Sequence, residues 1–154
     1  MSMNDEMLID FLRGTGPDAR GRYHADILKF SDEELENTHD YIQWLFPLCE
    51  PSGCWADAPC VRDETVIAVL RMDSRVQDGM IDALARMEQF YRNNDFWLRQ
   101  GDHNHLRITR ILKSVSIFNT KENAEEFYGF ITRRVESAMP VTQESLRYWK
   151  ESMV

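Results

Sequence analysis

The chain has 154 residues, of which 43% are hydrophobic and 29% are charged, and these values are typical of one globular domain. Its formal net charge of −8 repels nucleic acid and anionic lipid at long range, which argues against both as main partners. No apolar run approaches the length of about 18 residues that a membrane span needs, so no transmembrane segment is predicted.

Apolar residues recur at helical spacing between breaks that contain glycine or proline. The predicted helices cover residues 4–12, 31–46, 64–71, 74–91, 104–118, 120–135 and 142–153. No alternating strand pattern longer than a few residues is present. The sequence therefore predicts an all-α fold, in which residues 1–154 form a single compact domain of about seven helices without a sheet.

Several helix starts have capping signals. Ser31 with Glu34 and Ser74 with Gln77 have the spacing of a capping box, and Asn104, Thr120 and Thr142 stand where single caps are expected. In the helix over 31–46, we expect Leu35, His39 and Ile42 to share a buried face, and Pro47 to end the helix. Leu106 and Ile108 are expected to face inward in the helix over 104–118.

Two segments resemble a known family. Residues 36–47 read Glu-Asn-Thr-His-Asp-Tyr-Ile-Gln-Trp-Leu-Phe-Pro, and residues 104–114 read Asn-His-Leu-Arg-Ile-Thr-Arg-Ile-Leu-Lys-Ser. Together they are similar to the signature of the opioid growth factor receptor conserved (N-terminal) domain. Asp26-Ile-Leu28, Ala58-Pro59 and Phe90-Tyr91 stand where that family has similar residues. The resemblance runs from about residue 23 to 134.

The resemblance implies a receptor-like binding domain. Animal members are described as receptors for a small enkephalin-type peptide, and they are associated with the nucleus or nuclear envelope. Their long polar tail and basic localisation segments have no counterpart here, which indicates a stand-alone short member. The N-terminal sequence has no basic leader followed by an apolar core, and the cysteines are odd in number. We therefore expect a cytoplasmic protein with reduced thiols.

A basic stripe runs along the helix over 104–118. Arg107, Arg110 and Lys113 recur every three residues, with His103 and His105 at the start. Such a stripe can bind a phosphate, a peptide carboxylate or RNA. Alternatively, the arginines form structural ion pairs with acids such as Glu36 or Asp40, and this interpretation is favoured because the first 60 residues are rich in acids.

An aromatic strip accompanies the first signature segment. Tyr41 and Trp44 lie close together on one side of the predicted helix, and Trp55 follows in the next loop. They could line a groove for an aromatic-containing peptide, whereas aromatic stripes at helical spacing more often form core.

Catalytic and metal signatures are weak. His39 is expected to be a buried core residue rather than a general base, and no nucleophile is arranged with it. Cys49, Cys54 and Cys60 with His39 or His103 could bind zinc, but the tight Cys-x-x-Cys spacing is missing, so free thiols are expected.

The function hypotheses rank as follows. The leading hypothesis is a non-enzymatic module that recognises a short peptide or protein segment, without catalytic residues, metal or cofactor. Its predicted ligand-binding residues are Tyr41, Trp44, Trp55, His103, His105, Arg107, Arg110 and Lys113. The first alternative is a phosphate- or nucleic-acid-binding domain that uses Arg107, Arg110 and Lys113. The second alternative is an enzyme that uses His39 or His103.

Overall fold

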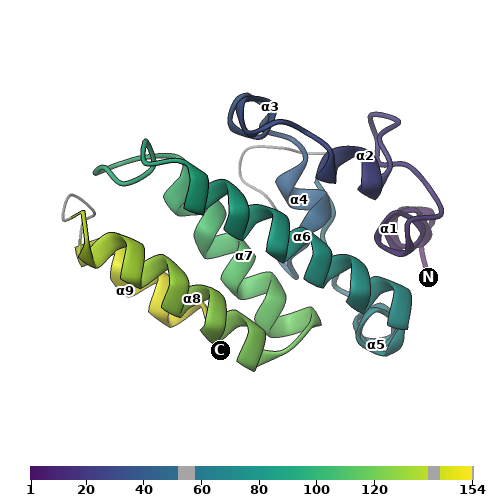
Figure 1. The fold of residues 1–154 in the computed structure, drawn as a ribbon. Coiled ribbons are helices and arrows are strands. Elements are labelled where there is room, and N and C mark those ends of the chain that lie inside the picture. The colour runs from purple at the N-terminus through teal and green to yellow at the C-terminus, as the bar shows by residue number, and fades with distance from the viewer. Residues whose placement is uncertain (52–57, 139–142, 154) are drawn as a thin grey trace. The chain divides into compact units, whose positions relative to one another are not determined.

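The computed structural model describes residues 1–51, 58–138 and 143–153, and this part of the chain contains helices and no strand (Figure 1). Its helices are α1 (Met3–Arg13), α2 (His24–Leu28), α3 (Asp32–Asn37), α4 (Ile42–Leu45), α5 (Glu64–Met72), α6 (Ser74–Asn93), α7 (Asn104–Phe118), α8 (Lys121–Glu136) and α9 (Gln143–Ser152). An isolated parallel bridge joins Leu48 to Cys60. The prediction of an all-α fold is confirmed.

The chain divides into two compact units, an N-terminal unit (Met1–Ala83) and a C-terminal unit (Leu84–Val154). The long helix α6 contributes residues to both. That residues 1–154 form one domain stays a prediction. No helix in the described ranges is long and apolar enough to cross a bilayer.

The N-terminal unit has its own apolar core. Helix α1 begins at a capping box in which Ser2 Oγ accepts from the backbone N–H of Asp5 at 3.1 Å, and it ends at Gly14, whose φ of 82° favours glycine. Helix α1 packs against α4. The buried apolar side chains of this unit include Leu8, Phe11, Leu12, Ile27, Leu35, Tyr41, Phe46, Val66, Leu70, Val76 and Met80.

The helix predicted over residues 31–46 is broken into α3 and α4. The capping box of Ser31 and Glu34 is present, with both hydrogen bonds at 3.0–3.1 Å. The backbone then leaves the helix at Thr38, which is extended at φ −103° and ψ 128°. His39 lies in this break and is exposed, so its expected place on a buried helical face is wrong. The short helix α2 has no counterpart among the predicted helices.

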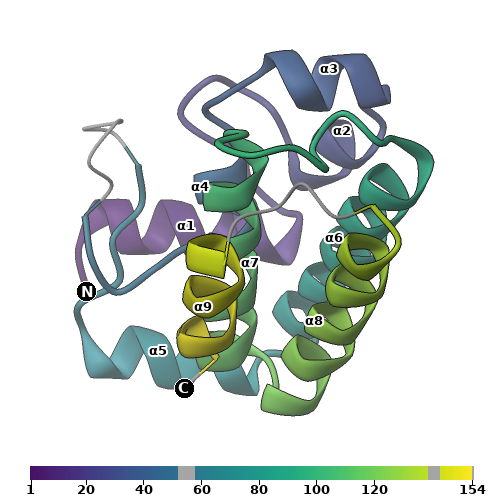
Figure 2. The ribbon, with the colours of Figure 1, turned by 90° about the vertical axis from the view of Figure 1, so that its left-hand side faces the viewer.

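The C-terminal unit is built on α7, α8 and α9, which lie side by side (Figure 2). Thr120 caps α8 as predicted, because its Oγ1 accepts from the backbone N–H of Asn123 at 3.1 Å. Leu106 is 75% exposed and does not face inward as expected. The proposed cap Thr142 lies outside the described residues. The buried side chains of the unit include Met87, Phe90, Tyr91, Trp97, Ile108, Ile111, Leu112, Val115, Phe118, Phe127, Ile131 and Trp149.

Another cap differs from the prediction. Helix α6 is not capped by Ser74 and Gln77, because the carboxylate of Asp73 accepts from the backbone N–H groups of Arg75 and Val76 at 2.9 and 3.1 Å. The side chain of Gln77 instead donates to the backbone carbonyl of Leu70 at 2.8 Å. It therefore joins α6 to the preceding helix α5.

Candidate functional site

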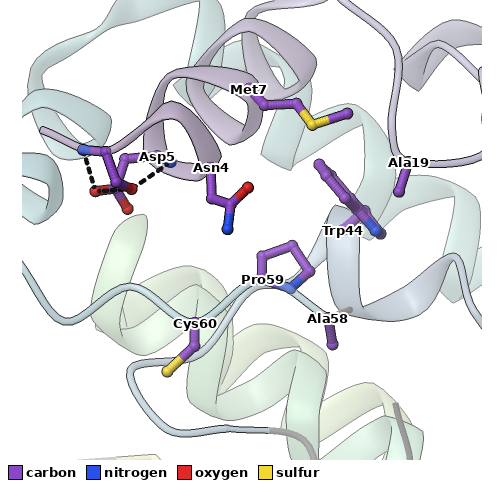
Figure 3. Close-up of a pocket in the computed structure, with 9 residues that line it drawn as sticks. Asn4, Asp5, Met7, Ala19, Trp44, Ala58, Pro59 and Cys60 are labelled. Atoms are coloured by element: carbon purple, nitrogen blue, oxygen red, sulfur yellow. Dashed lines mark hydrogen bonds between the residues drawn. The ribbon is translucent and has the colours of Figure 1, made fainter. Parts of the chain in front are cut away.

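A cavity of about 380 Å³ opens on the N-terminal unit (Figure 3). Its wall consists of residues from the start of α1, from the loop after α1, from α4 and from the segment before α5. The lining residues are Ser2, Asn4, Asp5, Met7, Ala19, Trp44, Ala58, Pro59 and Cys60. The volume falls within the range of roughly 300–1,000 Å³ in which small-molecule sites are found.

Trp44 is the large aromatic residue of this wall. Its indole is 7% exposed, and it packs edge-on against Phe11, with the ring centroids 5.4 Å apart. In Figure 3 the ring lies between Met7 and Ala19 on one side and Pro59 on the other. Helix α4 holds Trp44 in place, since this helix packs on α1. The indole of Trp44 is therefore held in place by its neighbours and forms a fixed part of the cavity wall.

A network of ion pairs holds the loop that carries Ala19. The Asp18 carboxylate accepts from the backbone N–H groups of Arg20 and Arg22, each at 2.9 Å. The Arg22 guanidinium pairs with Asp18 at 2.7 Å and with Asp40 at 2.9 Å. Burial lowers the pKa of Arg22, but the hydrogen bonds and charges of Asp18 and Asp40 outweigh it and raise the pKa above its ordinary value. Arg22 is therefore a permanent cation that links the loop to the break between α3 and α4.

Several of the other cavity residues are polar. Asp5 Oδ2 accepts from the backbone N–H and the hydroxyl of Ser2, at 3.0 and 2.8 Å. Cys60 is a free thiol whose Sγ lies 3.4 Å from Arg62 Nε, and Cys49 is exposed. Cys54 lies outside the described residues. Within the described ranges, no group of three or more His, Cys, Asp and Glu side chains could hold a metal ion.

The sequence-predicted site residues fall into two groups in different units. Tyr41 and Trp44 lie in the N-terminal unit, and Trp55 lies outside the described residues. Tyr41 is buried, and its hydroxyl donates to the Leu35 carbonyl at 2.9 Å. Trp44 alone of the described predicted residues lines the cavity. The combination of an aromatic groove with the basic stripe stays a prediction.

The start of the basic stripe is a hydrogen-bonded cluster in the C-terminal unit. Asn104 donates to Asp102 from its backbone and side chain, both at 2.9 Å, and its Oδ1 accepts from the Tyr91 hydroxyl at 3.2 Å. Arg107 is only 6% exposed, and its Nη1 lies 3.5 Å from Asn104 Oδ1. Burial raises the pKa of Asp102, but the hydrogen bonds from Asn104 and Arg99 outweigh it and hold the pKa below its ordinary value.

His105 is a buried connector between helices α7 and α9. Its Nε2 lies 2.8 Å from the backbone carbonyl of Trp97, and its Nδ1 lies 3.0 Å from Ser145 Oγ. Since a carbonyl only accepts, Nε2 carries the proton. Trp149 stands edge-on to the ring and donates from Nε1 to the His105 carbonyl at 3.0 Å. His103 is exposed, and Arg110 and Lys113 are half-buried. The three cations therefore do not form one exposed row.

Sequence reasoning missed most of the cavity wall. The buried stripe of α1 is centred on Leu8, Phe11 and Leu12 and leaves Met7 at its margin. Ala58 and Pro59 were singled out only for their place in the family resemblance. The signal that the sequence offered for this cavity wall was an apolar residue at the edge of a helical stripe.

Comparison with known proteins matches a region that contributes part of the cavity wall. Residues 22–96 match the opioid growth factor receptor (OGFr) conserved region. Trp44, Ala58, Pro59 and Cys60 lie within the matched region, whereas the second signature segment at 104–114 lies beyond it. No solved structure shows significant similarity to the chain.

Curated relatives have the same family name. The opioid growth factor receptor of Rattus norvegicus is 31% identical over 75% of this chain and 23% of its own length. The Homo sapiens receptor is 35% identical over 53% of this chain and 14% of its own. Opioid growth factor receptor-like protein 1 of Mus musculus is 27% identical over 84% of this chain and 32% of its own. The chain thus spans a third or less of these relatives' lengths. Residues 22–96 of the chain are thus similar to the conserved region of the opioid growth factor receptor family.

Proposed function

We propose that this chain is a non-enzymatic binding module that recognises a short peptide or protein segment at the cavity of the N-terminal unit. The observation that supports it best is the cavity itself, which has a volume of about 380 Å³ and a wall formed by Trp44 within the conserved region. A cavity of this size accepts one or two side chains of a peptide, with the aromatic ring as a contact surface.

The names of the relatives support a binding role. The rat and human relatives are named receptors for an opioid growth factor, which supports a peptide or protein partner for this chain. Of the predicted site residues, Trp44 is the one on which this proposal depends. Tyr41 does not line the cavity, since it is buried and its hydroxyl donates to the Leu35 carbonyl.

A binding screen with a cavity-filling variant tests the proposal. An enkephalin-type peptide and an array of short peptides of varied sequence are screened against the purified chain, and each hit is measured by titration calorimetry. The substitution Ala58→Phe places a ring in the cavity wall. We expect at least one peptide to bind the unmodified chain and to lose roughly tenfold or more in affinity for the variant, since filling the cavity removes the contact surface.

The matched control is Ala138→Phe, the same change at an exposed alanine that does not line the cavity. Peptide affinity should be unchanged in this control. If no peptide on the array binds, or if hits bind Ala58→Phe as tightly as the unmodified chain, the proposed function is wrong.

A further inference from the structure

The indole N–H of Trp44 distinguishes it from the other buried aromatic donors. Trp97 Nε1 donates to the carbonyls of Tyr91 and Asn94 at 3.1 and 2.7 Å, and Trp149 Nε1 donates to the carbonyl of His105 at 3.0 Å. The Tyr41 hydroxyl also has an acceptor. No hydrogen bond joins Trp44 Nε1 to another described residue, and the atom is not among the fully buried nitrogen and oxygen atoms without a partner, so it is accessible to water although the residue as a whole is buried.

A donor of this kind is available to a ligand. The N–H group of a buried tryptophan ring usually has a hydrogen-bond partner. At the wall of an open cavity, water can serve as the acceptor until a ligand displaces it. The ligand that fits therefore presents a hydrogen-bond acceptor next to an apolar group that can lie against Met7, Pro59 and the indole face.

The net charge of the N-terminal unit indicates which kind of hydrogen-bond acceptor the ligand presents to Trp44. The unit contains 17 acidic and 7 basic residues, a net charge of −10, whereas the C-terminal unit contains 9 acidic and 11 basic residues, a net charge of +2. Three of the seven bases, Arg13, Arg20 and Arg22, are held in ion pairs with aspartates of the same unit. A carboxylate ligand would be repelled by this field, whereas a neutral peptide carbonyl would not.

The immediate surroundings of the cavity contain charges of both signs. Asp5 lines the cavity, whereas Glu6 and Asp10 of the same helix line a different pocket. Two arginines are neighbours of lining residues: Arg62 donates to the thiol of Cys60, and Arg20, next to Ala19, is paired with Asp40. The one carboxylate of the cavity wall, Asp5, agrees in sign with the net charge of the whole unit.

We propose that the cavity binds a cationic peptide segment, in which one bulky apolar side chain lies against Met7 and Trp44 while a main-chain carbonyl accepts a hydrogen bond from Trp44 Nε1. This inference rests on the proposed function and adds the charge class of the ligand and the residue that positions its backbone. Lysine or arginine residues that flank the apolar anchor interact with Asp5 and with the negative charge of the N-terminal unit. Acidic peptides are rejected for the same reason.

Three matched peptides test the charge selection. Each has one central phenylalanine, flanked by lysines, by serines or by glutamates, and a fluorophore for anisotropy titration against the full chain. We expect the lysine peptide to bind about tenfold more tightly than the glutamate peptide, with the serine peptide between them, which is the effect of two or three exposed ion pairs. Raising the salt concentration should weaken the binding of the lysine peptide and narrow this difference.

Two tryptophan variants test the hydrogen bond. Trp44→Phe keeps an aromatic ring and removes the N–H, so it should lower the affinity of the lysine peptide by roughly 2- to 12-fold, the effect of one neutral hydrogen bond. The control, Trp149→Phe, also removes an indole N–H, but one that donates to His105 within the C-terminal unit. It should lower thermal stability and leave peptide affinity unchanged. Circular dichroism melts of both variants establish that they are folded at the titration temperature.

The outcomes separate this inference from the proposed function. If no peptide binds in a way that Ala58→Phe blocks, the proposed function fails. If peptides bind and Ala58→Phe blocks them, but the glutamate peptide binds as tightly as the lysine peptide, the charge selection is wrong. If Trp44→Phe binds the lysine peptide with unchanged affinity, the hydrogen bond is wrong. Selective binding of the lysine peptide that Trp44→Phe weakens supports the inference.

Discussion

The guanidinium of Arg22 contacts Asp40, four residues before the cavity tryptophan Trp44, with Nη1 2.9 Å from Asp40 Oδ1. The same guanidinium contacts Asp18, whose carboxylate is fully buried. Arg22 therefore pairs with two carboxylates and joins the loop after α1 to the first signature segment. This segment has a structural role in addition to presenting Trp44.

Replacing Arg22 should destabilise the chain far more than replacing Arg20. Arg22→Ala leaves the buried Asp18 carboxylate without its guanidinium, which we expect to cost about 3 kcal/mol. Arg20 contacts the same Asp40 at 2.9 Å, but its side chain is 66% exposed, so Arg20→Ala should cost less than about 1 kcal/mol. Urea unfolding of both variants measures the difference. Equal losses of unfolding free energy in the two variants would show that the buried ion pair contributes no more to stability than the exposed one.

Two glycines within helices should respond in opposite directions to replacement by alanine. In a helix interior, alanine is favoured over glycine by about 1 kcal/mol. At Gly79 a Cβ would lie 3.1 Å from the backbone carbonyl oxygen of Leu12, which cannot move without shifting α1. At Gly129 a Cβ would lie 3.2 Å from Arg133 Nη1, the end of a flexible side chain.

We therefore expect Gly79→Ala to lower the midpoint of thermal unfolding and Gly129→Ala to raise it. Differential scanning calorimetry of the two variants checks both signs. A higher midpoint for Gly79→Ala would mean that α1 and α6 can separate by a few tenths of an ångström without loss of packing.

The all-α class and most helices could be predicted from the sequence because they depend on local signals. The capping box of Ser31 and the cap of Thr120 are contacts within four residues, and the sequence shows them directly. The apolar stripes of α7 and α8 likewise need no knowledge of the rest of the fold.

The break between α3 and α4 could not be predicted, because its cause is distant in the sequence. Residues 31–46 have helical periodicity throughout, yet Asp40 is held by Arg20 and Arg22 from an earlier loop. This ionic contact outweighs the small preference for continuing the helix. The cavity was missed for a similar reason, since its wall combines α1, α4 and the segment before α5. Such a wall depends on tertiary contacts that periodicity does not encode.

The stability of the N-terminal unit should depend on pH through His24. His24 is buried beside Phe11, with ring centroids 5.6 Å apart, and its Nε2 has no hydrogen-bond partner in the described part of the chain. Burial lowers the pKa of His24, and the nearby charge of Asp82 opposes this only in part. Below the ordinary histidine pKa of about 6.5, the unfolded chain therefore binds a proton that the folded chain does not.

The contribution of His24 to stability is therefore present above about pH 6.5 and is lost as the pH falls through the lowered pKa of the folded state. His24→Phe removes this titration and the unsatisfied nitrogen. The free energy of unfolding should then fall less between pH 7 and pH 5 in the variant than in the unmodified chain. Urea unfolding at pH 7 and pH 5 gives the change in the free energy of unfolding for each protein. Comparing the two changes cancels the contribution of the other histidines. Equal losses of unfolding free energy in His24→Phe and in the unmodified chain would contradict the prediction.

Helix α9 should depend on His105 for its attachment to α7. His105 bonds to Trp97 and Ser145, and its carbonyl accepts from Trp149 of α9. His105→Phe keeps a ring beside Trp149 and removes both side-chain hydrogen bonds, leaving the Trp97 carbonyl without its imidazole donor. We expect a loss of about 1–3 kcal/mol and faster amide hydrogen exchange in residues 143–152. Ser145→Ala is the control, because it keeps the Trp97 bond and should cost about 1 kcal/mol or less. Unchanged exchange in α9 of His105→Phe would show that the buried Trp149 is sufficient to hold this helix.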